Sequence, residues 1–363
     1  MPRAQARVDL AAIEANVAGL RGRLTGDAAL CAVVKADGYG HGAVPAARAA
    51  LAGGASWLAV ATAAEAEDLR GAGLDTRILV MGALCATELE RAIGARADVA
   101  AWHPRFVESV AGRAPIHVKL DTGMGRLGTR DPDVADATVT AAGDGLAGLW
   151  THFATADERD DRFFDEQLGR FRAWALPHRE RRPGLKLHAA NSAATLRDPA
   201  AHFDMVRCGV AIYGLDPFGV DPAAHGLRPA LELRSYVAEL KACEPGESAG
   251  YGRRFIASQR TCVATVPIGY GDGWRRALTN NGDVLIRGRR FPLAGTVSMD
   301  NLTVDVGPRP DVRRGDEVVL IGGALRAEEV ARRIGTINYE VTTGLTARVP
   351  RVHHRDGEPP GEA

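Results

Sequence analysis

Short apolar runs that alternate with segments of helical periodicity constrain the fold of this chain most strongly. Eight such runs occupy the first two thirds of the sequence, at residues 30–35, 57–61, 77–81, 98–101, 116–120, 147–152, 186–190 and 205–208. Between most of them the apolar residues recur with helical spacing, as in 63–73 and 163–176. Eight strands that alternate with helices predict an α/β fold with an N-terminal (β/α)8 TIM-like barrel. For the fourth and seventh runs the pattern alone does not separate strand from helix.

The pattern changes after about residue 225, where strand-like segments are separated by turn signals such as EPGES, NNGD and RRGD. Only 326–335 looks helical there. The sequence therefore predicts a barrel over residues 1–228, a mainly β domain over 229–354 and a loose C-terminal tail over 355–363. At the other end of the chain, apolar residues at helical spacing predict an amphipathic helix that Asp9 N-caps.

Composition narrows the class of protein. The 363 residues carry no formal net charge and the basic residues are scattered, so neither nucleic acid nor an anionic membrane is an expected partner. No apolar run approaches the roughly 18–20 residues that span a bilayer. Polar residues interrupt the N-terminal apolar stretch, which argues against a signal peptide. Five widely spaced cysteines without a CxxC pair predict reduced thiols in a cytoplasmic protein, with no metal site. We expect a small-molecule substrate.

Polar side chains stand where several of the predicted strands end, and in a barrel such positions converge on the C-terminal face, where active sites lie. They are Lys35, Lys119, Asp121, His152, Asn191, Ser192 and Arg207. One such group from each of several strands predicts a functional site at that face.

Lys35 is the most informative of these residues. Only four of the 45 basic residues are lysines, at 35, 119, 186 and 241, and an amine can lose its proton and attack a carbonyl whereas a guanidinium cannot. A lysine desolvated at the end of an apolar strand has a lowered pKa and can form a Schiff base. The alternative is a lysine whose stem is buried while its ammonium reaches water. The glycines that follow it would let backbone approach a ligand.

An ordered set of motifs extends this interpretation. AVVKADGYGHG (32–42), HVKLDTGMGRLG (117–128), THFATAD (151–157), HAANSAAT (188–195), MVRCGVAIYG (205–214), IGYGDGW (268–274), VSMD (297–300) and INYEV (337–341) occur in this order. The set resembles that of the alanine racemases, which are fold-type III pyridoxal-phosphate enzymes. The resemblance runs from about residue 7 to 353. It implies a barrel followed by a β domain, a head-to-tail homodimer with shared active sites, and pyridoxal 5'-phosphate as cofactor.

The resemblance also implies a role for individual residues. Lys35 would carry the cofactor and act as one base, and Tyr251 of a second subunit would act as the other. Arg126 and Met299, with Asp300 beside it, would bind the amino-acid substrate. The remaining cofactor contacts would come from Tyr39, His152, Ser192, Arg207, Gly209, Val210 and Tyr339.

Two of these roles have a chemical rationale and one leaves an alternative open. A tyrosine is a weak base near neutrality, and a network to His152 and Arg207 would help Tyr251 by stabilising its phenolate. Arg207 keeps its proton and would therefore leave the pyridine nitrogen unprotonated. Lys119 matches a lysine that is carbamylated in some family members, while an unmodified pair with Asp121 is the alternative.

Removal of an α-proton on one face and delivery on the other is the reaction that this pair of bases predicts. The resemblance implies alanine as the substrate and D-alanine for peptidoglycan as the cellular product. Two alternatives remain at the level of sequence. One is a racemase of the same family that acts mainly on another amino acid such as serine. The other is a non-catalytic pyridoxal-phosphate carrier, although such single-domain barrels lack the β domain.

Overall fold

The computed structural model describes residues 2–358 and divides into two compact units. The barrel unit comprises Ile13–Phe218 and His225–Leu227. The β unit comprises Gly219–Ala224, the chain from Arg228 onward and the N-terminal residues as far as Ala12.

One eight-stranded parallel sheet forms the centre of the barrel unit. Its strands are β2 (Ala29–Val33), β3 (Trp57–Val60), β4 (Arg77–Val80), β5 (Asp98–Ala101), β6 (Ile116–Lys119), β7 (Leu146–Trp150), β8 (Lys186–His188) and β9 (Met205–Cys208). They lie in the order β8-β7-β6-β5-β4-β3-β2-β9. Every apolar run of the first two thirds of the sequence is one of these strands, including the fourth and seventh, so the predicted barrel is confirmed.

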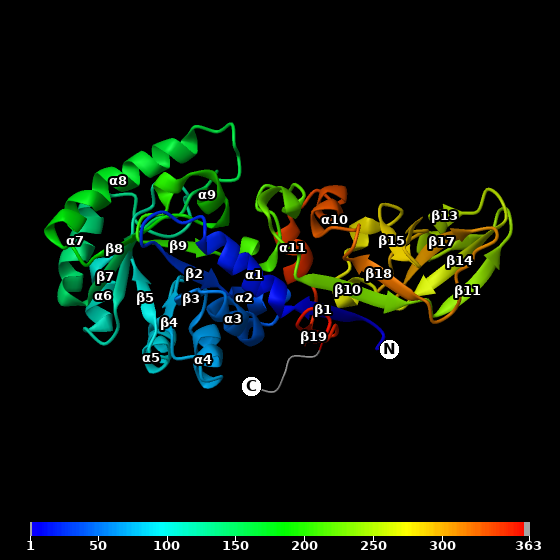
Figure 1. Ribbon diagram of the computed structural model, residues 1–363, viewed down its shortest axis with the longest axis horizontal. Helices are drawn as coiled ribbons and strands as arrows, with labels where there is room; N and C mark the ends of the chain where they lie inside the picture. Colours follow the sequence, from blue (N-terminus) through cyan, green and yellow to red (C-terminus); the bar gives the residue numbers. More distant parts are fainter. Residues whose placement is uncertain (1, 359–363) are drawn as a thin grey trace. The chain divides into compact units, whose positions relative to one another are not determined.

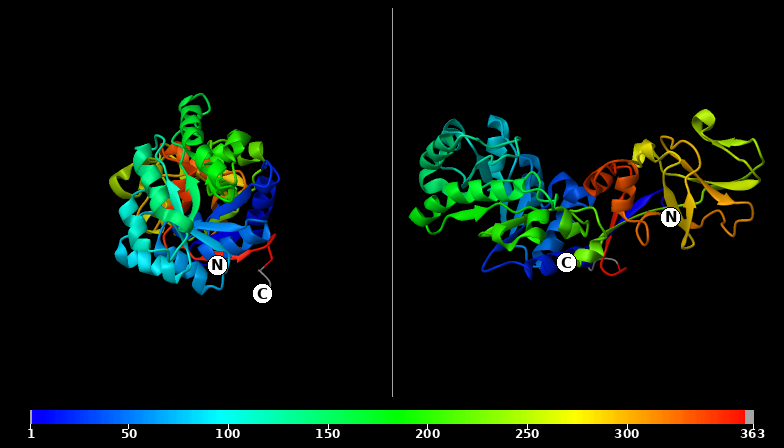
Figure 2. Two further views of the ribbon diagram at one scale, coloured as in Figure 1. Left: turned by 90° about the vertical axis from the view of Figure 1, so that its left-hand side faces the viewer. Right: turned by 90° about the horizontal axis from the view of Figure 1, so that it is seen from above.

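The sheet comes close to closing between β8 and β9. The amide of Asp204 donates to Leu187 O at 3.0 Å, and that of Arg207 donates to Ala190 O at 2.9 Å. Helices lie on the outer side of the strands in Figure 1, and Figure 2 shows the same unit from two further directions. The helices of this part of the chain are α1 (Leu10–Arg21), α2 (Lys35–Gly40), α3 (Ala43–Ala52), α4 (Ala63–Gly71), α5 (Ala86–Gly94), α6 (Pro104–Val110), α7 (Pro132–Ala142), α8 (Phe163–Arg181) and α9 (Ser192–Arg197).

The β unit contains three sheets within the described residues, in the orders β16-β15-β18-β10-β1-β19, β11-β14-β17 and β12-β13. Its strands are β1 (Gln5–Asp9), β10 (Leu231–Tyr236), β11 (Glu239–Cys243), β12 (Ser248–Ala249), β13 (Phe255–Ile256), β14 (Thr261–Val266), β15 (Asp283–Ile286), β16 (Arg289–Pro292), β17 (Leu302–Gly307), β18 (Glu317–Ile321) and β19 (Arg351–His354). Its helices are α10 (Ala327–Arg333) and α11 (Asn338–Thr343). The mainly β character predicted for this region is confirmed.

The N-terminal strand belongs to the β unit, whereas the sequence interpretation placed residues 1–228 together in the barrel. Strand β1 pairs antiparallel with β10 and parallel with β19, and its Ala6 and Val8 are buried. Five residues carry too little pattern to reveal strand partners that lie more than two hundred positions away. The helix that follows begins as predicted, since Asp9 Oδ1 accepts from the amide of Ala11 at 3.0 Å.

Two other predictions for the C-terminal region need correction. Residues 326–335 are not the only helical segment, because α11 follows α10 at once; its six residues NYEVTT include β-branched valine and threonines, which gave little helical signal. The predicted tail begins with an ordered turn, in which Arg355 and Glu358 exchange backbone hydrogen bonds of 2.8 and 2.9 Å. Residues 359–363 of that tail lie outside the described residues. Within residues 2–358 we find no helix both long and apolar enough to cross a membrane.

The position of β1 leads to a prediction about stability. Ala6→Asp places a carboxylate at a fully buried site between two strands, and we expect it to lower the free energy of unfolding by about 3 kcal/mol or more. Arg7→Asp, on the opposite face of the same strand, should cost about 0.5 kcal/mol. Calorimetric unfolding of both variants measures the difference. Equal effects would mean that β1 is not an internal strand of this sheet.

Candidate active site

Lys35 lies just beyond the carboxyl end of β2, at the start of a left-handed turn. Ala36, Asp37, Gly38 and Tyr39 have φ values of 52°, 52°, 60° and 54°. Such a conformation is unfavourable by roughly 1–2 kcal/mol for each residue that carries a Cβ. The turn is held by hydrogen bonds from Ala36 N to Glu65 Oε1 at 2.7 Å and from Ala43 N to Asp37 Oδ1 at 2.9 Å. Strain of this kind is typical of functional sites, where surrounding contacts fix the backbone.

The electrostatic surroundings of Lys35 suit a nucleophilic amine. Burial lowers the pKa of Lys35, and the positive charge of Arg126 lowers it further, while Glu65 opposes the shift. A larger share of the amine is therefore unprotonated near neutrality than for a lysine in water. The structure favours the desolvated lysine over the alternative of an ammonium in open water.

Tyr39, Ser192 and Gly209 lie together at the ends of β2, β8 and β9. Ser192 Oγ accepts from the amides of Gly209 at 3.0 Å and Ala211 at 3.3 Å, which leaves its own hydrogen to donate. A Cβ on Gly209 would lie 2.3 Å from Tyr39 Oη, so only glycine fits there. Burial holds the pKa of Tyr39 above its ordinary value, and the hydroxyl stays protonated. Val210 follows Gly209 and is buried.

The loop after β6 carries Arg126 and is organised by Asp121. The carboxylate of Asp121 accepts from the amides of Gly123 and Gly125, each at 3.0 Å, and from Arg130 Nε at 3.0 Å. Burial would raise the pKa of Asp121, but these hydrogen bonds outweigh it and lower the pKa. Arg126 itself is exposed, so its guanidinium is available to an anion.

Lys119 is buried at the end of β6, with its Nζ 4.4 Å from the centre of the Trp150 ring. Burial, together with the charges of Arg207 and Arg126, lowers its pKa to about 7. Asp121 partly opposes this shift, although the carboxylate directs its hydrogen bonds to its own loop. An amine half deprotonated near pH 7 is reactive, whereas the sequence singled out Lys119 only through its place at a strand end and its match to a modified lysine in some family members.

Arg207 is buried at the end of β9, and several of its N–H groups have acceptors within the protein. Its Nη2 donates to Thr151 O at 2.8 Å and Ala189 O at 3.0 Å, and its Nη1 donates to His188 Nδ1 at 2.9 Å. Burial lowers the pKa of Arg207 to about 10, which leaves the guanidinium charged at neutral pH. The sequence interpretation missed His188, because it ends a strand predicted as an ordinary apolar run.

His152 lies beside Arg207, with its Nδ1 3.4 Å from Arg207 Nη2. Burial and the nearby cations, Arg207 first among them, hold the pKa of His152 well below its ordinary value. The imidazole is neutral and can accept hydrogen bonds. The barrel unit thus brings together Lys35, Tyr39, Lys119, His152, Ser192, Arg207 and Gly209 at the carboxyl ends of its strands.

The three predicted site residues of the C-terminal region lie in the β unit. Tyr251 is 74% exposed and Met299 52% exposed, and Tyr339 stands on α11. Their exposure leaves Tyr251 and Met299 free to meet a ligand or another molecule.

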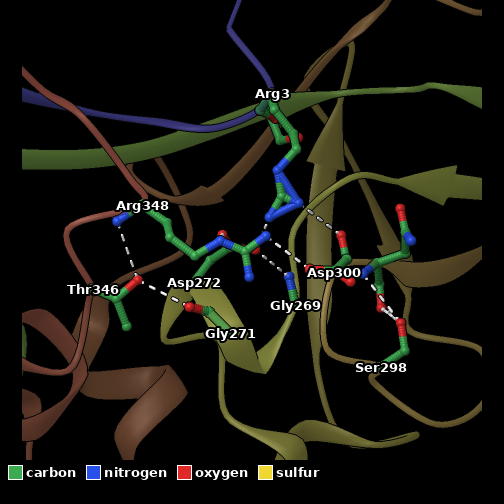
Figure 3. A network of polar contacts seen from close by, with 10 residues as sticks. Arg3, Gly269, Gly271, Asp272, Ser298, Asp300, Thr346 and Arg348 are labelled. Carbon is green, nitrogen blue, oxygen red and sulfur yellow. Dashed lines mark hydrogen bonds and ion pairs between the residues drawn. The ribbon is translucent and has the colours of Figure 1, made fainter.

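Asp272 contributes a buried carboxylate to the polar network drawn in Figure 3, which also includes Ser298 and Asp300, the neighbours of Met299 in the sequence. Asp272, only 1% exposed, forms ion pairs with Arg3 and with Arg348, and it accepts from the amide of Gly269 at 2.9 Å. Arg348 also pairs with Asp300 at 2.7 Å. The amide of Gly271 donates to Met299 O at 2.9 Å. Asp272 was not singled out from the sequence, although it lies within the IGYGDGW motif.

A strand-end lysine of lowered pKa, hydroxyls around a glycine and a buried arginine define a barrel protein built to handle an amine and an anion. Family models match nearly the whole chain: the alanine racemase N-terminal domain over residues 8–217 and the C-terminal domain over 230–353. Alanine racemase of Frankia casuarinae is 43% identical over 370 residues, covering 96% of each chain.

Comparison with solved structures also gives alanine racemases. Alanine racemase from Streptomyces lavendulae superposes with a TM-score of 0.90 at 39% identity and covers 97% of both chains. The Bacillus anthracis enzyme, solved with bound L-Ala-P, gives a TM-score of 0.89 at 36% identity, covering 99% of this chain and 96% of that one. The chain belongs to the alanine racemase family.

The network around Asp272 yields a prediction. Asp272→Ala leaves two arginines without their shared acceptor, and we expect a loss of about 2 kcal/mol in unfolding free energy. Asp300→Ala removes a carboxylate that is half exposed, and it should cost less than about 1 kcal/mol. Denaturant unfolding compares the two variants. A larger loss for Asp300→Ala would contradict the central position given to Asp272.

Proposed function

We propose that the protein interconverts L-alanine and D-alanine with pyridoxal 5'-phosphate as cofactor. The observation that carries the proposal is the half-buried amine of Lys35, whose pKa burial lowers, at the strand ends near which Tyr39, Ser192 and Arg207 also stand, in a chain that matches alanine racemases over almost its full length. The cellular role would be to supply D-alanine for peptidoglycan, and we expect it to be carried out in the cytoplasm.

The residues present fit this cofactor. An aldehyde reacts with an unprotonated amine, and the lowered pKa of Lys35 favours that form. A phosphate needs donors, and the hydroxyls of Tyr39 and Ser192, the backbone around Gly209 and Val210, and Tyr339 of the β unit supply that type of group. Arg207, fixed as a cation, suits the pyridine nitrogen, and His152 supports it. When bound, the cofactor acidifies the α-proton by delocalising the charge left at Cα.

Two bases move the proton in this proposal. Lys35 takes or returns the α-proton on one face of the substrate, and Tyr251 does so on the other. Arg126 binds the substrate carboxylate, and the backbone of Met299 contacts the substrate. Arg207 keeps its proton and donates to the pyridine nitrogen without protonating it, which limits charge delocalisation and disfavours side reactions.

A homodimer completes this site in the proposal, with Tyr251 and Met299 contributed by the second subunit. The high exposure of both side chains supports a role in an interface. A racemase acting mainly on serine remains the alternative within the family, because the residues named here bind groups that all amino acids share.

Turnover and isotope exchange test the two-base assignment. Tyr251→Phe should lower kcat about a thousandfold, with α-proton exchange lost on one face only, since removing a general base typically costs 10²–10⁴-fold. Tyr236→Phe, at a half-buried tyrosine of β10, is the matched control and should be unaffected. Chiral chromatography follows the products from L-alanine and L-serine. Exchange retained on both faces in Tyr251→Phe would refute the assignment of Tyr251 as a base. If D-serine forms faster than D-alanine, serine and not alanine is the preferred substrate.

Lys119 is further proposed to carry a carbamate. Its neutral amine attacks carbon dioxide, forms an N–C bond and releases a proton to water, so the product is an anion that can pair with Arg126. Because the pKa is about 7, the neutral amine predominates above pH 7 and is lost below it.

Carbon-13 NMR with labelled bicarbonate tests the modification. We expect a carbamate signal that grows from pH 6 to 8, disappears in Lys119→Arg and persists in Lys186→Arg. A signal that survives in Lys119→Arg would assign it to another amine, and no signal at pH 8 would leave Lys119 unmodified.

A further inference from the structure

A chain of hydrogen-bonded side chains runs through the interior of the barrel below Arg207. Arg207 Nη1 lies 2.9 Å from His188 Nδ1, and His188 Nε2 lies 2.8 Å from His117 Nδ1. His117 Nε2 lies 2.9 Å from Asp98 Oδ2, which Arg77 contacts at 2.5 Å. The links come from β9, β8, β6, β5 and β4, so the chain connects the two ends of the barrel.

The direction of every hydrogen bond follows from the two ends of the chain. A guanidinium only donates, so His188 Nδ1 must accept and its proton sits on Nε2. His188 Nε2 then donates to His117 Nδ1, which places the proton of His117 on Nε2 as well. That proton is donated to Asp98, since a carboxylate only accepts. Both imidazoles are therefore neutral, with the same tautomer.

The packing leaves the two rings little freedom. His188 stacks on the Trp150 ring with centroids 5.7 Å apart, and the edge of His117 meets Trp57 at 5.7 Å. A Cβ on Gly148 would lie 2.5 Å from His117 Nδ1, the atom that accepts from His188. Both histidines are completely buried.

We propose that Asp98 and His117 are positioning residues for Arg207. Asp98 fixes the tautomer of His117, His117 fixes that of His188, and His188 then presents a lone pair to the guanidinium. Among the residues that the structure describes, no carboxylate bonds to Arg207 directly; its acceptors are this lone pair, two carbonyls and, at the longer distance of 3.4 Å, His152 Nδ1. The chain thereby holds Arg207 in one orientation.

A purely structural role explains the chain less well. Branched aliphatic side chains usually fill a barrel interior, and a buried polar network is costly unless every member is satisfied. The Arg77–Asp98 pair alone would stabilise strand ends without any histidine. A second pair of the same type supplies the comparison: Arg179 and Asp204 form an ion pair, Asp204 accepts from the amide of Leu187, and within residues 2–358 no histidine bonds to it.

Nitrogen-15 NMR of histidine-labelled protein tests the tautomers without reference to turnover. In the purified holoenzyme we expect His117 and His188, assigned through His117→Gln and His188→Gln, each to carry a single proton, on Nε2. A cationic ring or a proton on Nδ1 at either residue would overturn the proposal.

Substitution then tests the positioning. Asp98→Ala should release the tautomer of His117 and lower kcat for alanine about tenfold or more with KM little changed, because small misplacements cost up to about a hundredfold. Asp204→Ala should leave both the histidine signals and kcat unchanged. Unaltered signals in Asp98→Ala would refute the role of Asp98, and should that variant fail to fold, the spectra of the unsubstituted protein decide.

The effect on kcat rests on the proposed function, whereas the tautomers do not. If the tautomers are as expected but the protein has no racemase activity, the proposed function is refuted and the proposed hydrogen-bond network is not. If the racemase activity is normal but the tautomers differ, only the proposed hydrogen-bond network from Asp98 to Arg207 is refuted.

Discussion

A buried guanidinium dictates much of the barrel interior. Arg207 is buried away from water, so the protein has to supply acceptors in fixed directions, and it does so with two carbonyls, the Nδ1 of His188 and, at 3.4 Å, the Nδ1 of His152. The same charge acts on its neighbours. It contributes to the lowered pKa values of Lys119 and His152, and Arg126 acts in the same sense on Lys35. The positive groups at this face thus lower one another's pKa values, and an anionic ligand would reduce the repulsion between them.

Much of the fold could be predicted because each barrel strand is a local apolar run. The convergence of Lys35, His152 and Arg207 at the carboxyl ends of the barrel strands could be predicted for the same reason, since each stands at or near the end of such a run. What escaped depends on contacts between distant parts of the chain. Strand β1 is defined by partners that begin at residues 231 and 351, and the lowered pKa of Lys119 depends on its burial and on the charges of Arg207 and Arg126. No periodicity within a single segment encodes such a relation.

In the β unit, the backbone at exposed residues such as Tyr251 and Met299 is fixed by hydrogen bonds and not by burial of their side chains. Tyr251 and Met299 project to solvent, but each backbone is tied down: Thr296 Oγ1 donates to Tyr251 O at 2.7 Å, and Gly271 N donates to Met299 O. Asp272 draws the extreme N-terminus and the 346–348 loop into the same arrangement. The precision of an exposed group here comes from hydrogen bonds beneath it rather than from burial.

The left-handed turn after Lys35 has a consequence for how this segment can change. Four successive residues wind against the usual hand, and the turn is closed by bonds to fixed points on either side, at Val34 and Ala43. These bonds fix the number of residues that the turn can contain. A residue inserted between 35 and 42 would rotate every later position and disconnect Asp37 from Ala43, whereas insertions at exposed loop tips elsewhere are absorbed. We therefore expect residues 34–43 to tolerate no change of length. An engineered protein would have to contain this segment complete or not at all.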